Sequence, residues 1–295
     1  MSTVGFVGIG AMGEPMVANL LKKGFGVTVL KHRREEPANR LHEQGAKVVT
    51  AAVALADSEV IVLCLPTSSE VEATLVGERG LLDNLRADTI VVDCSTSEPQ
   101  STAQLAAHAR NRDIGFVAAA MTRGVAGAKQ GTLAFFVGGE PAYVERAQTI
   151  LSAMGNTFIH FPTAAEAHTA KLISNVLSYS TVALVNEALM MGAKSGLDLA
   201  ILHQALMEGA PSKALEAFGP RIIARDSDPP RVTIDHACDD LLMQQALAAR
   251  TSAPTFMHSM AQELYRALSA RGLGERDIAM IAELWRSRES DSGRQ

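Results

Sequence analysis

Short apolar runs alternate with helical spacing over the first half of the chain. The run at residues 3–7 precedes a glycine cluster, and residues 11–23 then place apolar side chains three and four positions apart. The first pattern is typical of a buried strand and the second of a helix. Further strands are expected at residues 27–30, 47–49, 60–65, 89–94, 115–119 and 132–137, with a helix in or near 40–44. This alternation predicts an α/β, Rossmann-like fold with a mostly parallel sheet, to which residues 133–137 would add an antiparallel edge.

From residue 163 onward helical spacing dominates and strand-like runs nearly vanish. Residues 164–193 hold no proline, and no glycine before Gly192, which predicts one helix of about 45 Å at roughly 1.5 Å per residue. Such a helix is long enough to link two domains. Shorter helices are expected at residues 198–208, 212–223, 235–250, 253–271 and 274–287. We therefore expect a first domain over residues 1–163, an all-α domain over 164–290 and a disordered tail over 291–295.

Composition narrows the class of protein. The chain is 47% apolar and 20% charged, with a net charge of −5, which is ordinary for a globular protein and does not suggest a nucleic-acid partner. No apolar run approaches the roughly 20 residues that span a bilayer, and no signal peptide precedes the first strand, so no membrane association is expected. The three cysteines fit neither a zinc site nor a disulfide framework. A reducing cytoplasm and no metal are the expectation.

A glycine pattern follows the first expected strand directly. Gly8, Gly10 and Gly13 form GxGxxG, with Ala11 and Met12 between the last two, and the pattern opens an expected helix. The first glycine permits a tight turn, the second lets a pyrophosphate approach the backbone, and the third lets helix and strand pack closely. Free N–H groups at the helix start would then hold the anion. In this context the pattern predicts a dinucleotide site, the alternative being a plain strand-to-helix turn.

The end of the second expected strand should contact the adenosine ribose. An acid there would favour NAD, but the residues are Lys31, His32, Arg33 and Arg34, with no acid before Glu35. Cations pair with a 2′-phosphate through charge-assisted bonds. This favours NADP over NAD as the cofactor, the alternative being a solvated basic turn.

A polar stripe lies on the long helix. Lys171, Ser174, Asn175 and Ser178 are spaced 0, 3, 4 and 7 and share one helical face. Because their neighbours are apolar, we expect this helix to be largely buried; these neighbours are Leu172, Ile173, Val176, Leu177 and Val182. The stripe is either solvent-facing or places the lysine in a cleft between the domains. In the cleft, desolvation would lower the lysine pKa and suit it to work as a general acid and base.

Several ordered motifs resemble the β-hydroxyacid dehydrogenase family, which includes 3-hydroxyisobutyrate dehydrogenase and tartronate semialdehyde reductase. The family's GxGxMGxxM pattern appears at residues 8–16, its loop after the fourth strand at 65–67 and its D-x-S-T-x-x-P stretch at 93–99. Its K-x-x-x-N pair appears as Lys171 and Asn175. The likeness covers nearly the whole chain.

The resemblance implies an NAD(P)-dependent enzyme that transfers hydride between the cofactor and a small 3-hydroxy acid or acid semialdehyde. Lys171 would exchange a proton with the carbonyl oxygen, and Asn175 would hydrogen-bond the substrate. Leu65 and Pro66 would line the adenosine side of the cofactor, and Thr96 would lie beside the nicotinamide ribose and the substrate. The further substrate contacts would be Thr122, Arg123, Gly124 and Ser178.

Two departures from the family pattern bear on the substrate. Where the family reads D-A-P-V-S-G-G, residues 118–124 read Ala-Ala-Ala-Met-Thr-Arg-Gly, so Thr122 keeps a hydroxyl and Arg123 replaces a glycine. An arginine beside the substrate's acid group is similar to sulfolactaldehyde reductases, so the acid is a carboxylate or a sulfonate; alternatively, Arg123 points to solvent. In the later K-D-L motif, Asp239 replaces the lysine.

Two other functions stay open, an imine reductase and a dinucleotide-binding module without turnover. Lys171 argues against the first, because imine reductases usually carry another residue there, often Asp or Tyr. The resemblance also implies a homo-oligomer, a dimer or tetramer, for which the apolar run 182–191 is a candidate interface. An ordinary intramolecular core is the alternative for this run.

Overall fold

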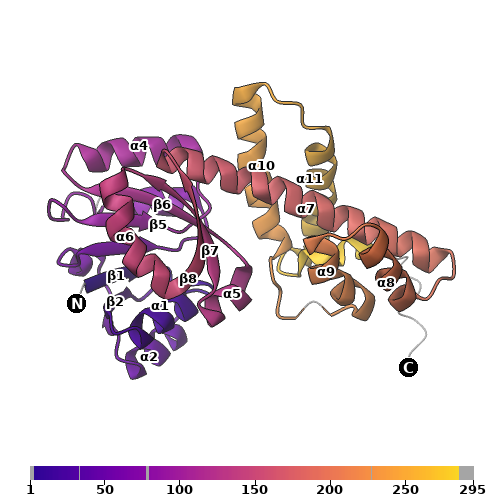
Figure 1. Cartoon of the computed structure of the whole chain (residues 1–295), viewed down its shortest axis with the longest axis horizontal. Helices are drawn as coiled ribbons and strands as arrows, with labels where there is room; N and C mark the ends of the chain where they lie inside the picture. Colours follow the sequence, from indigo (N-terminus) through magenta and orange to yellow (C-terminus); the bar gives the residue numbers. More distant parts are fainter. Residues whose placement is uncertain (1–2, 33, 78–79, 227, 286–295) are drawn as a thin grey trace. The chain divides into compact units, whose positions relative to one another are not determined.

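The first half of the chain forms one eight-stranded sheet with helices on both faces (Figure 1). The computed structural model describes residues 3–32, 34–77, 80–226 and 228–285. The strand order is β3-β2-β1-β4-β5-β6-β7-β8, parallel throughout except where β7 runs antiparallel to β6. The strands are β1 (Thr3–Val7), β2 (Gly26–Leu30), β3 (Lys47–Val49), β4 (Val60–Leu63), β5 (Ile90–Asp93), β6 (Gly115–Thr122), β7 (Leu133–Gly139) and β8 (Gly155–Phe161).

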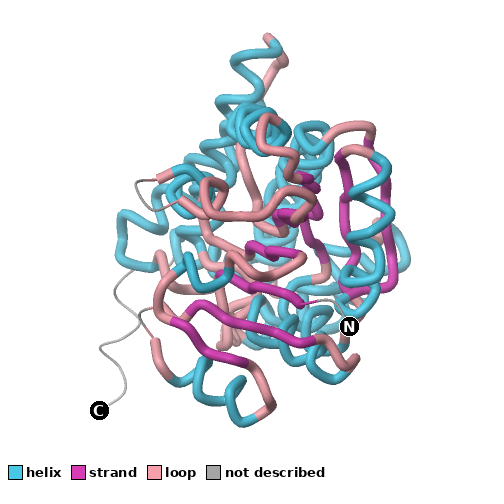
Figure 2. Tube along the Cα trace, turned by 90° about the vertical axis from the view of Figure 1, so that its left-hand side faces the viewer, coloured by secondary structure: helices cyan, strands magenta, loops and turns pink. Residues whose placement is uncertain are grey.

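Alternating side chains divide the core of this sheet between its two faces. On β4, Val60 and Val62 join one apolar cluster, while Ile61 and Leu63 join the other. Helices α1, α2, α5 and α6 supply residues to the first cluster, and α3 and α4 to the second. Figure 2 shows the strands as magenta segments among cyan helices. The helices are α1 (Gly13–Lys22), α2 (Glu36–Glu43), η1 (Ala52–Leu55), α3 (Ser68–Val76), α4 (Pro99–Arg110), α5 (Gly124–Gln130) and α6 (Pro141–Met154).

The strand order reverses at the centre of the sheet. From β1 the chain adds β2 and β3 on one side and then returns to add β4 on the other. Ligands of such sheets bind at the carboxyl ends of the strands, where the order reverses. The fold therefore points to the loops that follow β1 and β4.

The second half of the chain is helical, as its periodicity predicts. The chain divides into two compact units between Lys171 and Leu172, and the long helix α7 crosses this division. A separate apolar cluster fills the second unit, with Tyr265, Ile234 and Leu241 fully buried in it. The elements are α7 (Ala164–Lys194), α8 (Leu199–Gly209), α9 (Lys213–Ala224), α10 (Ile234–Thr251), α11 (Phe256–Leu268), η2 (Ser269–Leu273) and η3 (Ile278–Trp285).

Three expectations need correction. Strand β7 is antiparallel to β6 as expected, but β8, which was not predicted, pairs with it and forms the edge instead. Residues 278–285 form a 3₁₀ helix rather than an α-helix. The expectation that α7 is buried around the stripe fails on one face, where Ile173 and Leu177 are 59% and 71% exposed. The expected tail at 291–295 lies outside the described residues.

Among the described residues, α7 is the one helix long and apolar enough to cross a membrane by composition. A core helix of a water-soluble protein can have the same length and composition. The helix carries buried polar groups, among them Lys171, Asn175 and Asn186, and its Tyr179 and Val182 belong to the second unit's core.

Candidate active site

The glycine turn joins β1 to α1 in a conformation that only glycine fits at two of its three positions. Gly8 has φ +97°, and a Cβ there would lie 2.1 Å from the carbonyl oxygen of Cys64. A Cβ on Gly13 would lie 1.9 Å from the carbonyl oxygen of Gly8. A Cβ on Gly10 would meet nothing within 4 Å. The fold therefore requires the first and third glycines, whereas Gly10 leaves space on the outer side of the turn.

The start of α1 is suited to an anion. Its N-cap residue, Met12, makes no side-chain capping hydrogen bond, so no side chain competes for the first N–H groups of the helix. The N–H of Glu14 already donates to the carbonyl of Gly10 at 3.0 Å, which fixes the turn. Ala11 at its tip is exposed. An open glycine beside an uncapped helix start fits a dinucleotide's pyrophosphate.

The loops after β4 and β5 are tied together beside this turn. The N–H of Leu65 donates to the Ser95 hydroxyl at 3.0 Å. Asp93, fully buried at the end of β5, accepts from the Ser95 N–H at 2.9 Å and from the Ser97 hydroxyl at 2.8 Å. These bonds hold the half-buried Thr96 between two anchored neighbours. The structure thus brings the predicted residues of both loops to one edge of the sheet, with Pro66 exposed.

A buried histidine connects the first turns of α7 to the same edge. His168 is fully buried, its Nδ1 lies 2.7 Å from the Thr102 hydroxyl, and its Nε2 lies 3.9 Å from the Asp93 carboxylate. Burial lowers the pKa of His168, although the charge of Asp93 opposes this shift. Asp93 lies 75 positions before His168 in the chain, and no local sequence pattern indicates a partner at that distance. Lys171 follows one turn later on α7.

The basic turn after β2 contains an ion pair. Lys31 bonds the carboxylate of Glu35 one helical turn away, and this hydrogen bond lowers the pKa of Glu35. His32 and Arg34 are exposed, and Arg33 lies outside the described residues. Part of the positive charge predicted for a 2′-phosphate is therefore matched by an acid, which the i,i+4 spacing could have indicated.

Thr122 ends β6 and Gly124 begins α5, so both lie at the carboxyl end of β6. The side chain of Arg123, between them, binds other parts of the first unit. Arg123 has φ +79°. Its guanidinium donates to the Thr132 carbonyl at 2.6 Å, the Asn156 side-chain oxygen at 2.7 Å and the Thr157 hydroxyl at 2.9 Å. These bonds tie the arginine to the starts of β7 and β8. They lend no support to the expectation that its fork faces a substrate's acid group.

The polar stripe of α7 is split between buried and exposed positions. Lys171 and Asn175 are only 9% and 7% exposed, which excludes a solvent-facing stripe for these two, whereas Ser174 is half-buried and Ser178 is exposed. Asn175 donates from Nδ2 to the buried Asp240 carboxylate at 2.6 Å. The buried Lys171 therefore precedes this amide by one turn of α7.

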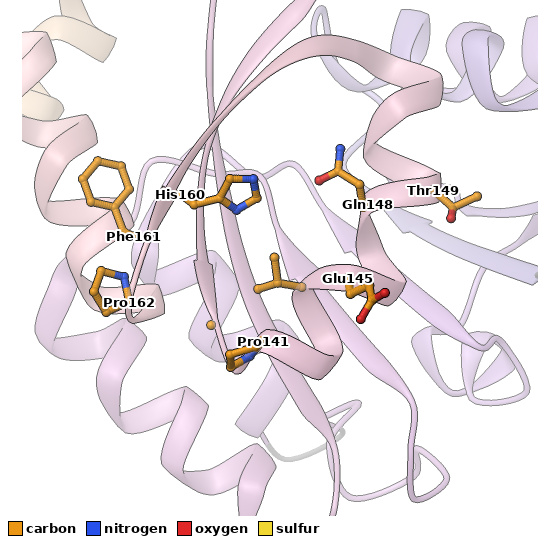
Figure 3. Close-up of a pocket in the computed structure, with 9 residues that line it drawn as sticks. Pro141, Glu145, Gln148, Thr149, His160, Phe161 and Pro162 are labelled. Carbon is orange, nitrogen blue, oxygen red and sulfur yellow. The ribbon is translucent and has the colours of Figure 1, made fainter.

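A hollow lies between α6 and β8 and is lined by residues other than those described above (Figure 3). Its volume is about 490 Å³, and Val144, Gln148 and His160 are among the residues that line it. None of the residues predicted for cofactor or substrate lines this hollow.

Comparison with known proteins agrees with this geometry. Residues 3–162 match the family model of the NAD-binding domain of 6-phosphogluconate dehydrogenase. Residues 165–285 match the model described as NAD-binding of NADP-dependent 3-hydroxyisobutyrate dehydrogenase. The NAD-dependent L-serine dehydrogenase of Pseudomonas aeruginosa is 30% identical over 97% of this chain and 98% of its own length.

Two solved structures share the whole architecture. The 3-hydroxyisobutyrate dehydrogenase of Mycobacterium tuberculosis, solved with L-serine, has a TM-score of 0.86 at 26% identity and covers 97% of this chain and 100% of its own. A protein named Psf3, solved with NADP⁺ and 2-OPP, has a TM-score of 0.86 at 25% identity and covers 96% and 100%. The chain therefore belongs to the β-hydroxyacid dehydrogenase family.

Proposed function

We propose that the protein oxidises a small 3-hydroxy acid, or reduces the matching acid semialdehyde, with Lys171 as general acid and base. The observation that carries the proposal is the burial of Lys171 on α7, one turn after His168, whose Nε2 lies 3.9 Å from the Asp93 carboxylate at the carboxyl end of β5. When bound, the nicotinamide cofactor supplies or accepts the hydride. In reduction, Lys171 gives its proton to the carbonyl oxygen; in oxidation, it removes the hydroxyl proton.

The remaining site residues divide between cofactor and substrate. Residues of the glycine turn would hold the pyrophosphate, and those after β4 would line the adenosine. We assign Thr96, Thr122, Gly124, Asn175 and Ser178 to the substrate. Arg123 already donates three of its five N–H groups to protein acceptors near the starts of β7 and β8, which leaves fewer donors for a substrate acid group. This favours a carboxylate held by the Thr122 loop over a sulfonate held by an arginine. The relatives' names, which include an L-serine and a 3-hydroxyisobutyrate dehydrogenase, agree with a hydroxy acid.

For the cofactor we propose NADP(H) over NAD(H). Lys31, His32 and Arg34 gather at the carboxyl end of β2, where the 2′-substituent of the adenosine ribose would lie, although Glu35 offsets one of these charges. Arg34→Ala should lower kcat/KM for NADPH by about tenfold and leave that for NADH unchanged, since only NADPH carries the phosphate. Equal kcat/KM for the two cofactors in the unaltered protein would contradict the assignment.

The catalytic proposal is tested by cofactor absorbance with a panel of substrates. The panel holds 3-hydroxyisobutyrate, L-serine, tartronic and succinic semialdehydes, sulfolactaldehyde and a cyclic imine. Lys171→Ala should lower kcat by about 10²- to 10⁴-fold, the usual contribution of a proton-transfer group. Lys194→Ala is the matched control, since Lys194 is exposed at the far end of the same helix. Turnover of the imine alone, or cofactor binding without turnover, would overturn the proposal.

We also propose that the protein forms a homo-oligomer through its helical half and acts in the cytoplasm. On α7, Ile173, Leu177, Leu184 and Met191 expose 59–71% of their surface at intervals of 4, 7 and 7 residues, which aligns them along one face. Two of these residues, Leu184 and Met191, lie in the expected interface run 182–191, whereas Val182 and Leu189 of that run are buried within the unit. Light scattering should show a smaller particle for Leu177→Glu.

A control for this test comes from the first unit. Val53 is also an exposed apolar residue, at 55%, and Val53→Glu should leave the particle mass unchanged. A monomeric unaltered protein would refute the oligomer. For domain limits we propose residues 1–163 for dinucleotide binding and 164–290 for substrate binding and assembly, which the two family models at 3–162 and 165–285 support.

A further inference from the structure

We infer that His168 is a positioning residue, which fixes the first turns of α7, and with them Lys171, against the loop that carries Thr96. The inference rests on the proposed function, in which Lys171 exchanges the proton and Thr96 contacts the substrate. His168 is fully buried, and its two ring nitrogens face different elements of the first unit. Nδ1 lies 2.7 Å from the Thr102 hydroxyl on α4, and Nε2 lies 3.9 Å from the Asp93 carboxylate at the end of β5.

The Asp93 carboxylate relates the histidine to the loop after β5. Its Oδ1 accepts from the Ser95 N–H at 2.9 Å, and its Oδ2 accepts from the Ser97 hydroxyl at 2.8 Å. Thr96 lies between these two bonded residues, so the place of the carboxylate sets the place of Thr96. Because His168 Nε2 approaches the same Oδ2, one buried acid links the first turns of α7 to the Thr96 loop.

The hydrogen on the ring makes this approach attractive. Burial lowers the pKa of His168, so at neutral pH the folded ring is neutral and carries one hydrogen. The Thr102 hydroxyl can donate to Nδ1, because the Glu98 carbonyl, 3.1 Å from that hydroxyl, already accepts the Thr102 backbone N–H at 3.0 Å. The ring hydrogen then lies on Nε2 and faces the Asp93 carboxylate. A hydrogen on Nδ1 would instead turn a lone pair toward a negative charge in a dry interior.

A displacement of His168 would act on Lys171 first. Lys171 is three positions later on the same helix, a rise of about 4.5 Å, and only 9% of its surface is exposed. A misplacement of about 1 Å between reacting groups can lower a rate by about 10²-fold. An apolar side chain would fill the same space without the cost of burying a polar ring, so the contacts of the two nitrogens are what a histidine adds here.

His168→Leu removes both nitrogens and leaves an apolar side chain in their place. We expect kcat for the hydroxy acid to fall by about 10- to 100-fold, while the Kd of NADPH stays unchanged. His168→Gln should recover part of this loss, because its amide can again donate toward Asp93. His258→Leu is the matched control and should keep kcat, since His258 is buried in the second unit, where its Nε2 lies 3.0 Å from the Leu241 carbonyl oxygen.

A double variant separates positioning from stability. If His168 acts through Lys171, then adding His168→Leu to Lys171→Ala should lower the residual kcat by less than about twofold, because the group that it positions is already gone. Each kcat is counted per mole of protein that binds NADPH, so unfolded protein does not enter the comparison. Losses that multiply in the double variant, or equal losses in His168→Leu and His168→Gln, would make His168 merely structural and overturn the inference.

The ring of His168 also offers a test that needs no turnover. If the unaltered protein turns over no hydroxy acid, the proposed function fails. The arrangement of the ring can then be read from the ¹⁵N shifts of His168, assigned by their loss in His168→Gln. These shifts should place the hydrogen on Nε2. A hydrogen on Nδ1 alone overturns the inference whether or not there is turnover.

Discussion

Gly10→Ala separates the cofactor-binding role of the glycine turn from its folding role. The added methyl group meets no atom within 4 Å, so the protein should fold as before. If a pyrophosphate lies against this glycine, the methyl group occupies its place and displaces at least one N–H to phosphate hydrogen bond. Hydrogen bonds to charged groups contribute about 1.5–3 kcal/mol, so NADPH should bind about 10- to 150-fold more weakly.

Gly13→Ala should behave in the opposite way. Its methyl group would lie 1.9 Å from the carbonyl oxygen of Gly8, against 3.4 Å for ordinary contact, so the turn must open. Overpacking of this kind costs about 1–3 kcal/mol, which corresponds to a fall in Tm of about 2–12 °C for a unit of this size. Cofactor binding should weaken as well, because the turn itself moves.

The assay is fluorescence titration with NADPH alongside thermal unfolding of each variant. Gly26→Ala serves as the control. A Cβ on Gly26 would also meet nothing within 4 Å, but Gly26 lies at the amino end of β2, whereas the glycine turn follows the carboxyl end of β1. Gly26→Ala should change neither the affinity for NADPH nor the Tm. Unchanged NADPH affinity in Gly10→Ala would refute the reasoning, because no phosphate could then lie against that position.

Three further predictions concern the loop arginine, the buried histidine and the thiols. Arg123→Gly should change the KM for an acid substrate less than about threefold and lower the free energy of unfolding by about 1 kcal/mol, because the three hydrogen bonds of the Arg123 guanidinium all go to protein acceptors. A large rise in KM would instead indicate that Arg123 binds the substrate. The pKa of His168 is lowered on folding, so the unfolded chain takes up a proton below about pH 6.5 that the folded chain does not. The free energy of unfolding should then fall with pH below 6.5, by up to about 1.4 kcal/mol per pH unit, and urea titrations of His168→Gln should show a shallower slope. Burial raises the pKa of Cys64 to about 12 and that of Cys94 well above its usual value, so an aromatic disulfide reagent at pH 8 should label both only after unfolding; rapid labelling of the folded protein would contradict this.

Local patterns determined most of the fold. Within the apolar runs at 3–7 and 60–65, residues 4–7 and 60–63 are buried on both faces of the sheet, and such strands are recognisable because nearly every side chain in them is apolar. The uninterrupted spacing of 164–193 likewise identified the long helix. Strand β8 was missed because its burial is irregular: it lies at the sheet's edge, and its sequence follows neither periodicity.

The sequence alone also located the glycine turn, the basic turn and the Lys171–Asn175 pair, because each is a local motif whose residues are close along the chain. Only the tertiary structure decided what those side chains contact. The partners of Asn175, His168 and Arg123 lie 65, 66 and up to 34 positions away, and no periodicity encodes such distances. A hydrogen bond depends on where two elements pack, so the folded chain, and not the local pattern, sets the Asn175 amide against Asp240 and turns the Arg123 guanidinium toward β7 and β8.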